Sequence, residues 1–237
     1  MKKILLYIAL CFSVMMQAQS LKGAWEATLT IETETTMQKV RSVAIFAEGY
    51  QVNTYYDAET GAFVGTNGGS WQLEGNQLSE TVEFDTQNPD RVGTTGVFEI
   101  ELSENELRAT DRDVVWKRID NGTPGDLAGA WLISGRMRNG ELQKRDTNRP
   151  RKTMKILSGT RFQWIAYNTE TKEFMGTGGG TYTTVNGKYT ENIEFFSRDD
   201  KRVGASLEFD YELKDGDWHH SGLSSKGQPI YEVWSLR

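Results

Sequence analysis

Apolar and polar residues alternate along most of the chain. In residues 98–102 Phe, Ile and Leu alternate with two glutamates, and residues 207–213 repeat the pattern with acidic residues between the apolar ones. A period of two puts successive side chains on opposite faces, which is typical of a half-buried antiparallel strand. Turn signals of the Asn-Gly and Asp-Gly type separate such segments, as at residues 139–140, 186–187 and 215–216. We predict about eight strands in each half of the chain, and no segment requires a helix.

One block of the sequence occurs twice. Residues 56–69 return as residues 167–180, a shift of 111 positions, and the same shift carries residues 80–84 onto residues 191–195. Each copy opens with Gly-Ala-Trp and closes with Val-Trp. A repeat that has its own beginning and end indicates a complete structural unit, so we predict two similar domains.

The chain therefore divides into a leader, two domains and a linker. We place a signal peptide at residues 1–19, the first domain at 20–120, the linker at 121–126 and the second domain at 127–237. The linker reads Asn-Gly-Thr-Pro-Gly-Asp, which is polar and rich in residues that interrupt strands.

The leader has the parts of a secretory signal peptide. Lys2 and Lys3 precede an apolar run at residues 4–16, and the small residue Ala18 follows before the expected cleavage site. This run is shorter than the roughly 20 residues that cross a bilayer as a helix, and no comparable run occurs later, so we expect no transmembrane segment. The only cysteine, Cys11, lies in the leader, so the remaining chain is expected to fold without disulfides. We expect an exported protein, periplasmic or secreted.

Uniformly short turns favour closed sheets. Eight hairpin-connected strands with one apolar face can form an up-and-down barrel or a sandwich, but a Greek-key sandwich needs a few long crossings, and closure removes the exposed sheet edges. The glycine runs at residues 65–69 and 176–180 provide places where a strand can bend at a barrel corner. We predict an all-β protein with two tandem antiparallel up-and-down β-barrels.

Charge is unevenly distributed along the chain, whose formal net charge is −6. Residues 20–122 contain 18 acidic and 8 basic side chains, whereas residues 123–237 contain 15 acidic and 17 basic ones. An acidic protein without a basic face is not expected to bind nucleic acid. Nine cations gather between Arg136 and Arg161 with two carboxylates among them, which makes this segment either a solvated loop and strand edge or a rim that attracts anions.

The start and end of each half resemble the lipocalin signature, in which a Gly-x-Trp tryptophan closes one end of the barrel and an arginine after the last strand stacks over it. Trp25 with Arg118 and Trp131 with Arg237 match that pattern. The second half also carries Tyr-Thr-Glu, His-His-Ser-Gly and Glu-Val-Trp motifs, and with them residues 127–237 are similar to the lipocalin-like domains of unknown function found in secreted bacterial proteins. The resemblance implies a barrel that holds a ligand, and it implies no reaction.

Two glutamates fall on the apolar face of predicted strands. Glu191 alternates in phase with Tyr189 and Phe195, and Glu80 alternates in phase with Phe84 in the first half. If the apolar face points into the barrel, both carboxylates do too.

A buried carboxylate without a partner costs on the order of several kcal/mol, so each glutamate must meet a cation, a hydroxyl group, water or a ligand. The candidate partners are Arg91 for Glu80 and Arg202 for Glu191. Two interpretations remain open, an internal ion pair or a pocket group that orients a ligand.

One histidine belongs to the same predicted face. His220 shares it with Trp218, and Glu232 shares parity with Trp234, so Glu191, His220 and Glu232 are expected around one cavity. A carboxylate beside a histidine can transfer protons, although such groups more often bind. Adjacent histidines leave a strand on opposite faces and chelate poorly. We assign no catalytic residue, no metal ligand and no cofactor.

The aromatic residues Phe162, Trp164, Tyr182 and Phe195 would fill a packed barrel or line an open one, because eight strands lie near the size at which barrels begin to hold a ligand. We assign the ligand-binding residues as Glu191, His220, Glu232, Trp164, Tyr182, Tyr189 and Arg202.

The expected function is to bind a small apolar or amphipathic ligand, with an anionic group as one option, mainly in the second barrel. Two alternatives stay open. One is a cofactor-free isomerase, lyase or cyclase that uses an enclosed cavity, and the other is a non-catalytic module with filled barrels that meets a cell-surface or polysaccharide partner. We favour binding over catalysis. Oligomeric state and ligand identity have no signal in the sequence.

Overall fold

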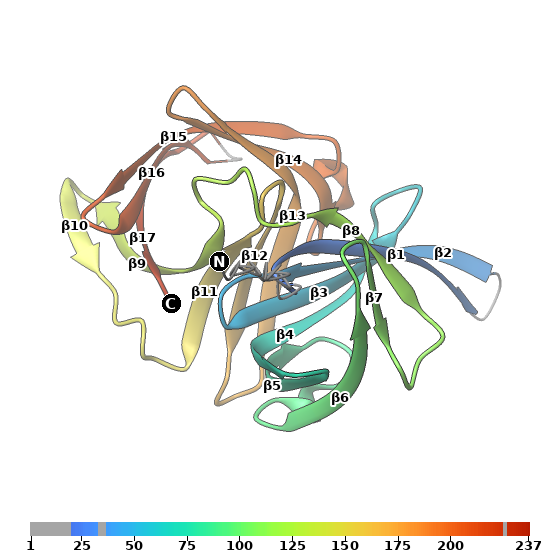
Figure 1. Ribbon diagram of the computed structural model, residues 1–237. Coiled ribbons are helices and arrows are strands. Elements are labelled where there is room, and N and C mark those ends of the chain that lie inside the picture. Colours follow the sequence, from blue (N-terminus) through green and yellow to red (C-terminus); the bar gives the residue numbers. More distant parts are fainter. Residues whose placement is uncertain (1–19, 33–36, 225–226) are drawn as a thin grey trace, which may run out of the picture.

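Two closed antiparallel barrels follow one another along the chain, each with strands in sequential up-and-down order (Figure 1). The computed structural model describes residues 20–32, 37–224 and 227–237, so the signal peptide expected at residues 1–19 lies outside the described part. The prediction of an all-β protein with two tandem up-and-down barrels is confirmed.

The first barrel closes where its first strand pairs with its last, with Trp25 opposite Arg118. A short 3-10 turn, η1 (Pro89–Arg91), lies between its fifth and sixth strands. The strands are β1 (Gly23–Glu32), β2 (Met37–Phe46), β3 (Tyr50–Asp57), β4 (Phe63–Glu74), β5 (Gln77–Asp85), β6 (Thr95–Leu102), β7 (Glu106–Ala109) and β8 (Val115–Asp120).

The second barrel closes in the same way, with Trp234 opposite Ile133, and a turn η2 (Asp200–Arg202) occupies the place of η1. The strands are β9 (Gly129–Arg138), β10 (Glu141–Lys144), β11 (Arg151–Leu157), β12 (Arg161–Asn168), β13 (Phe174–Val185), β14 (Lys188–Phe196), β15 (Ser206–Lys214), β16 (Asp217–Leu223) and β17 (Pro229–Leu236). The ninth strand is β10, which pairs with the outer half of β9.

Each barrel bends at a β-bulge opposite its glycine run. The extra residue is Glu83 in β5 and Glu194 in β14. The register of β4 against β5 shifts between Gly68 and Gly69, and a Cβ atom on Gly69 would lie 1.9 Å from the carbonyl oxygen of Thr81. Only glycine therefore fits, and the expectation of a bend at the glycine runs is confirmed.

A bulge also moves the following side chains to the other face of the strand. Phe84 and Phe195, which we expected on the inner face with Glu80 and Glu191, lie outside their barrels in an apolar core between the two. The prediction for these two phenylalanines is wrong, because counting alternate residues along a strand does not detect the extra residue of a bulge.

This core between the barrels is built from equivalent residues of the two repeats. Tyr56 stacks on Phe195 with ring centroids 5.0 Å apart, and Tyr167 packs on Phe84 at 4.8 Å. The 111-residue shift converts one pair into the other. The barrels thus meet as the two subunits of a symmetric dimer do, with the same patch on both sides.

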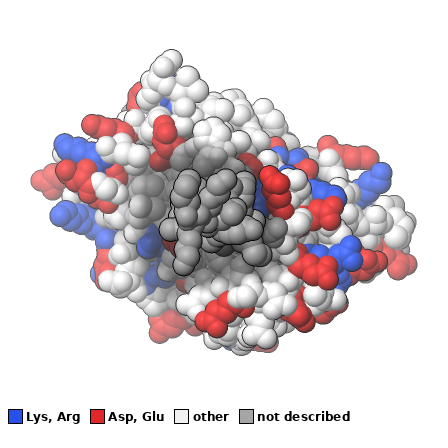
Figure 2. All heavy atoms as spheres, viewed as in Figure 1, with Lys and Arg blue, Asp and Glu red and all other residues white. Residues whose placement is uncertain are grey.

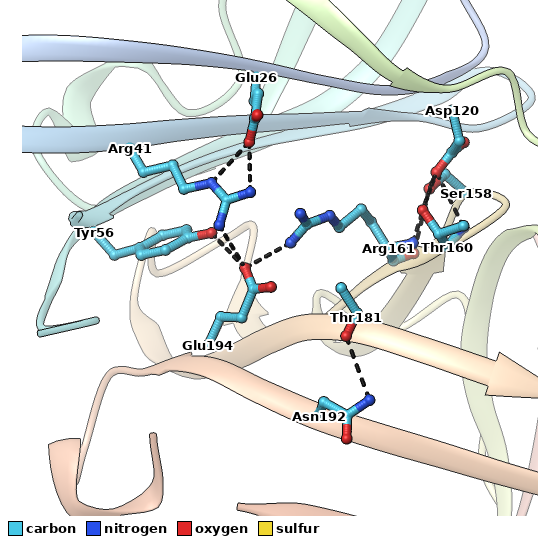
Figure 3. A network of polar contacts seen from close by, with 10 residues as sticks. All are labelled: Glu26, Arg41, Tyr56, Asp120, Ser158, Thr160, Arg161, Thr181, Asn192 and Glu194. Carbon is cyan, nitrogen blue, oxygen red and sulfur yellow. Dashed lines mark hydrogen bonds and ion pairs between the residues drawn. The ribbon is translucent and has the colours of Figure 1, made fainter. Parts of the chain in front are cut away.

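The bulge glutamates add charged contacts to the same interface. Glu194 accepts hydrogen bonds from Tyr56 at 2.8 Å and from the guanidinium of Arg161 at 2.6 Å, and Arg41 lies 3.3 Å away (Figure 3). The equivalent Glu83 accepts from Tyr167 in the opposite direction.

The residue that precedes the linker is bound to the second barrel. The carboxylate of Asp120, at the end of β8, accepts hydrogen bonds from Ser158 and Thr160 in the turn between β11 and β12 (Figure 3). It also accepts one from the backbone N–H of Gly159 in the same turn. The end of the first barrel therefore holds a hairpin of the second.

The two arginines expected to cover the barrel-closing tryptophans differ. Arg118 lies 3.9 Å from the ring centroid of Trp25, as expected. Arg237 does not cover Trp131; it pairs with Glu83 at 2.7 Å and stacks on Tyr50 at 3.9 Å, both in the first barrel. A carboxylate gives a guanidinium a stronger, charge-assisted partner than a ring face does.

Glu194→Ala should lower the free energy of unfolding by about 3 kcal/mol, because it leaves the buried guanidinium of Arg161 without its carboxylate. Urea denaturation of the whole chain measures the loss. The matched control is Glu208→Ala, which removes an exposed partner of Lys188 and should leave the stability nearly unchanged. Equal losses would mean that Glu194 contributes no more than a surface ion pair.

Candidate functional site

The second barrel encloses a cavity of about 580 Å³. The aromatic side chains of Trp164, Phe196, Phe209 and Trp234 form much of its wall, together with aliphatic residues of β9, β14, β15 and β17. This volume falls within the roughly 300–1,000 Å³ of small-molecule sites, so the interior is open rather than filled.

One end of this barrel is closed by packed aromatic rings. Trp131, the Gly-x-Trp residue, is buried, and its indole N–H donates a hydrogen bond of 2.9 Å to the carbonyl oxygen of Leu127. Its ring meets Trp218 edge-on at 5.9 Å. Trp25 makes the equivalent bond to Leu21 in the first barrel and is also buried.

A buried ion pair crosses the cavity. The ammonium of Lys155, on β11, lies 2.8 Å from the carboxylate of Glu191, on β14, and both residues are 5 % exposed. The same ammonium lies 4.9 Å from the ring centroids of Tyr189 and Trp218, and 5.3 Å from that of Trp234. Rings that face a cation stabilise it further, so an aromatic cage holds Lys155.

The partners that we expected for the two inner glutamates are wrong. Arg202 lies on η2, where its guanidinium is 3.7 Å from Asp199 and 5.0 Å from the ring centroid of Phe196. Arg91 pairs with Asp85 at 2.9 Å rather than with Glu80. Each arginine lines the same pocket as its expected partner, but it forms its ion pair with a carboxylate close to it in the sequence, Asp199 or Asp85.

Lys155 was missed because we counted it in the basic segment. The signal was its parity, since it alternates in phase with Leu157 and lies opposite Trp164 in the pairing of β11 with β12. Arg161, the last cation of that segment, is also buried, at the interface between the barrels. Neither residue belongs to a solvated rim.

Glu232 lines the cavity near its rim. Its carboxylate pairs with Arg136 and lies 3.6 Å from Nδ1 of His220. Burial alone would raise the pKa of Glu232, but the contact with His220 and the charges of Lys155 and Arg136 outweigh it and lower the pKa to about 2. Glu232 is therefore ionised at neutral pH.

His220 lies behind the cavity wall. Its ring is 2 % exposed and packs on Phe209 with centroids 4.3 Å apart, and His220 does not line the cavity. Burial, and then the charge of Lys155, lowers its pKa, so the ring is neutral at pH 7. Neither ring nitrogen has a hydrogen-bond partner among the described residues.

The two tyrosines that we assigned also belong to the packed end. Tyr182 donates a hydrogen bond of 2.6 Å to the carbonyl oxygen of Ser158, and Tyr189 is fully buried. Burial, and then the nearby Glu191, raises the pKa of Tyr189 well above its usual value. Of the seven assigned residues, Glu191, Glu232, Trp164 and Arg202 line the cavity, whereas His220, Tyr182 and Tyr189 support it from behind.

A basic hollow adjoins the cavity. Strands β9 and β11 pair only as far as Leu132 and Met154 and then diverge, and the chain after β10 covers the gap. The hollow there measures about 240 Å³, and Ile133 and Thr153 line both it and the cavity. Its charged lining consists of Lys144, Arg145, Asp146, Arg149, Arg151 and Lys152.

Positive charge gathers around this hollow, and Figure 2 shows Lys and Arg side chains among acidic ones at the edge of the molecule where β10 lies. Burial, and then the like charges of Arg136 and Arg151, lowers the pKa of Arg145. An anion placed here would relieve that repulsion.

The described residues contain no cluster of three or more His, Cys, Asp or Glu side chains with the arrangement of a metal site. Within the same residues, no helix has the length and apolar character needed to cross a membrane.

Fold and cavity define a tandem β-barrel protein whose second barrel has an interior of ligand size. Residues 126–235, which are this barrel, match the family model described as "Domain of unknown function (DUF4488)". The C-terminal half of the chain therefore carries a DUF4488 domain. No curated protein matches the chain.

Lys155→Met should destabilise the second barrel by about 3 to 5 kcal/mol, because Glu191 is left buried without its partner. The double variant Lys155→Met with Glu191→Leu is the matched control and should recover most of that loss, since apolar residues of similar volume often replace a buried ion pair without cost. Urea denaturation checks both. A double variant as unstable as the single one would show that the aromatic cage, not Glu191, makes the lysine necessary.

Trp131→Ala should cost about 3 to 5 kcal/mol of unfolding free energy, because it empties a packed site at the closed end. Trp164→Ala should cost less than about 2 kcal/mol, because this half-buried ring borders a space that is already open. Chemical denaturation of both variants compares the two positions, and equal losses would contradict the distinction between closed end and cavity wall.

Proposed function

We propose that this is an exported, lipocalin-like binding protein whose second barrel takes up a small amphipathic ligand with an apolar body and an anionic head. The proposed location is the periplasm or the exterior, to which the expected signal peptide would direct the chain. The observation that carries the proposal is the open cavity of about 580 Å³ with four aromatic side chains in its wall.

The charges around the cavity support an anionic head at the rim. Inside, Glu191 and Glu232 are each matched by a cation, so neither repels a negative ligand as an unpaired carboxylate would. Outside, the basic hollow contains five cations and one carboxylate and shares two lining residues with the cavity. A ligand can therefore keep its head in the hollow while its apolar part enters the barrel.

Binding is better supported than catalysis. A proton-transfer mechanism needs His220 within reach of the substrate, yet the cavity wall does not include this residue. The inner carboxylates are occupied by ion pairs, which suits a static pocket that selects a ligand by shape and charge.

The test is titration of the whole chain with dansylaminoundecanoic acid, a fluorescent fatty acid, at low and high salt. Ala205→Trp places a large ring in the cavity and should abolish the fluorescence increase, whereas the matched variant Ala109→Trp, which lines the first barrel, should not change it.

Reversal of Arg149, Arg151 and Lys152 to glutamate should weaken binding by about tenfold or more at low salt and by less at high salt, because it turns attraction of the head into repulsion. Reversal of three exposed cations elsewhere, Lys39, Arg108 and Lys214, gives the same net charge and should have little effect. Binding that persists in Ala205→Trp would remove the cavity from the proposal. Binding insensitive to both salt and the first reversal would remove the anionic head.

A further inference from the structure

The first barrel has a pocket of its own, and its lining is opposite in character to that of the second. Its volume is about 340 Å³, at the lower end of the roughly 300–1,000 Å³ found for ligand sites. The proposed function above makes no use of this pocket.

The repeat allows the two pocket linings to be compared position by position. Ala44 pairs with Asn53 in the first barrel as Lys155 pairs with Trp164 in the second, and one position pair is the other shifted by 111 residues. By the same shift Gln51 stands where the second barrel has Phe162. An amide thus replaces the wall aromatic Trp164, a second amide replaces the packed Phe162, and the buried lysine is replaced by a methyl group.

Two polar side chains of this pocket have unused hydrogen-bonding capacity. Gln51 is 4 % exposed, and among the described residues its side chain makes no hydrogen bond. Glu80, the equivalent of Glu191, likewise has neither a hydrogen-bond partner nor an ion pair within 4 Å in the described part of the chain. Gln51 is buried and Glu80 half-buried on the pocket wall, so the polar atoms of both can bind whatever occupies the pocket.

Neighbouring groups are held in place by the barrel itself. The hydroxyl of Ser42 donates to Asn53 at 2.9 Å, and the amide of Asn53 donates to the hydroxyl of Tyr55 at 2.8 Å. Tyr55 has a second polar neighbour in Asn67, whose residue also lines the pocket, so an amide and a phenol stand side by side on this wall. The network is anchored by the indole N–H of Trp116, which donates to Ser42 at 3.2 Å.

The rim is ordered in the same way. The carboxylate of Asp85 accepts hydrogen bonds from the backbone N–H groups of Gln87 and Asn88, each at 2.9 Å, and pairs with Arg91. This holds the loop between β5 and η1 at the mouth of the pocket, where both of these amide side chains line it.

We propose that the first barrel is a second binding site, and that it takes a neutral polyhydroxylated ligand of the size of a monosaccharide. Amides and a phenol both donate and accept hydrogen bonds, which matches hydroxyl groups that do the same. The charged lining is balanced, with Glu80 and Asp85 against Arg91 and Arg112, so it selects neither an anion nor a cation. The rings of Phe98 and Trp116 offer apolar surface to the C–H face of a sugar ring.

The experiment is saturation-transfer NMR on the whole chain with D-glucose, D-galactose, D-mannose and N-acetyl-D-glucosamine at millimolar concentration. We expect transfer to at least one of them and its loss in Ala109→Trp, which fills the pocket. The matched variant Ala205→Trp, in the other barrel, should bind the sugar as the unmodified chain does.

Gln51→Leu is the sharper variant, because it removes an amide that no described side chain needs and keeps the volume of the residue. It should weaken sugar binding about tenfold or more while the melting temperature stays the same or rises. It also decides the question if Ala109→Trp fails to fold. Three results would overturn the proposal: no transfer to any of the sugars, unchanged sugar affinity in Gln51→Leu, or loss of sugar binding in Ala205→Trp instead of Ala109→Trp. None of these results bears on fatty-acid binding by the second barrel.

Discussion

The contact between the two barrels is the interaction on which the rest of the structure depends. It forms because each barrel carries a bulge residue, Glu83 or Glu194, opposite a glycine run. The bulge bends the strand, turns Phe84 or Phe195 outward and sends a carboxylate to the tyrosine of the other barrel. One local insertion thus turns both a ring and a carboxylate toward the other barrel, and the duplication supplies both halves of the contact in one chain.

The two barrels have equivalent residues on the outer faces that meet, but different residues on their inner faces. The interface uses equivalent residues on both sides, whereas the inner faces of β2 and β3 carry Ala44, Gln51 and Asn53 against Lys155 and Phe162 on β11 and β12. The glutamate shared by both barrels shows the consequence. Glu191 is neutralised by a caged lysine, while burial raises the pKa of its equivalent, Glu80, against the weaker opposing effect of two arginines. The same scaffold therefore offers one aromatic and one amide-lined cavity.

Polar side chains without partners among the described residues lie on the inner faces of both barrels. A packed barrel would pair or replace Gln51 and Glu80, and their presence on an inner face has no structural benefit that the described residues reveal. In the second barrel the indole N–H of Trp234, on the cavity wall, is buried and has no hydrogen-bond partner in the described part of the chain. Both interiors thus keep hydrogen-bonding capacity that an ordinary core would have removed.

The sequence by itself determined the elements of the fold, because alternation, turn residues and the repeat are local signals that tertiary contacts did not override. It also placed Glu191, Glu232 and Trp164 on an inner face, since strand parity is a property of the backbone. Only the tertiary structure decided the partners. Lys155 rather than Arg202 meets Glu191, and Arg237 crosses to Glu83 instead of covering Trp131, because such pairs depend on register between strands and on the approach of the barrels. The alternation of residues along one strand carries no information about the register between strands or about the approach of the barrels. A single bulge residue also reverses which face the following side chains occupy.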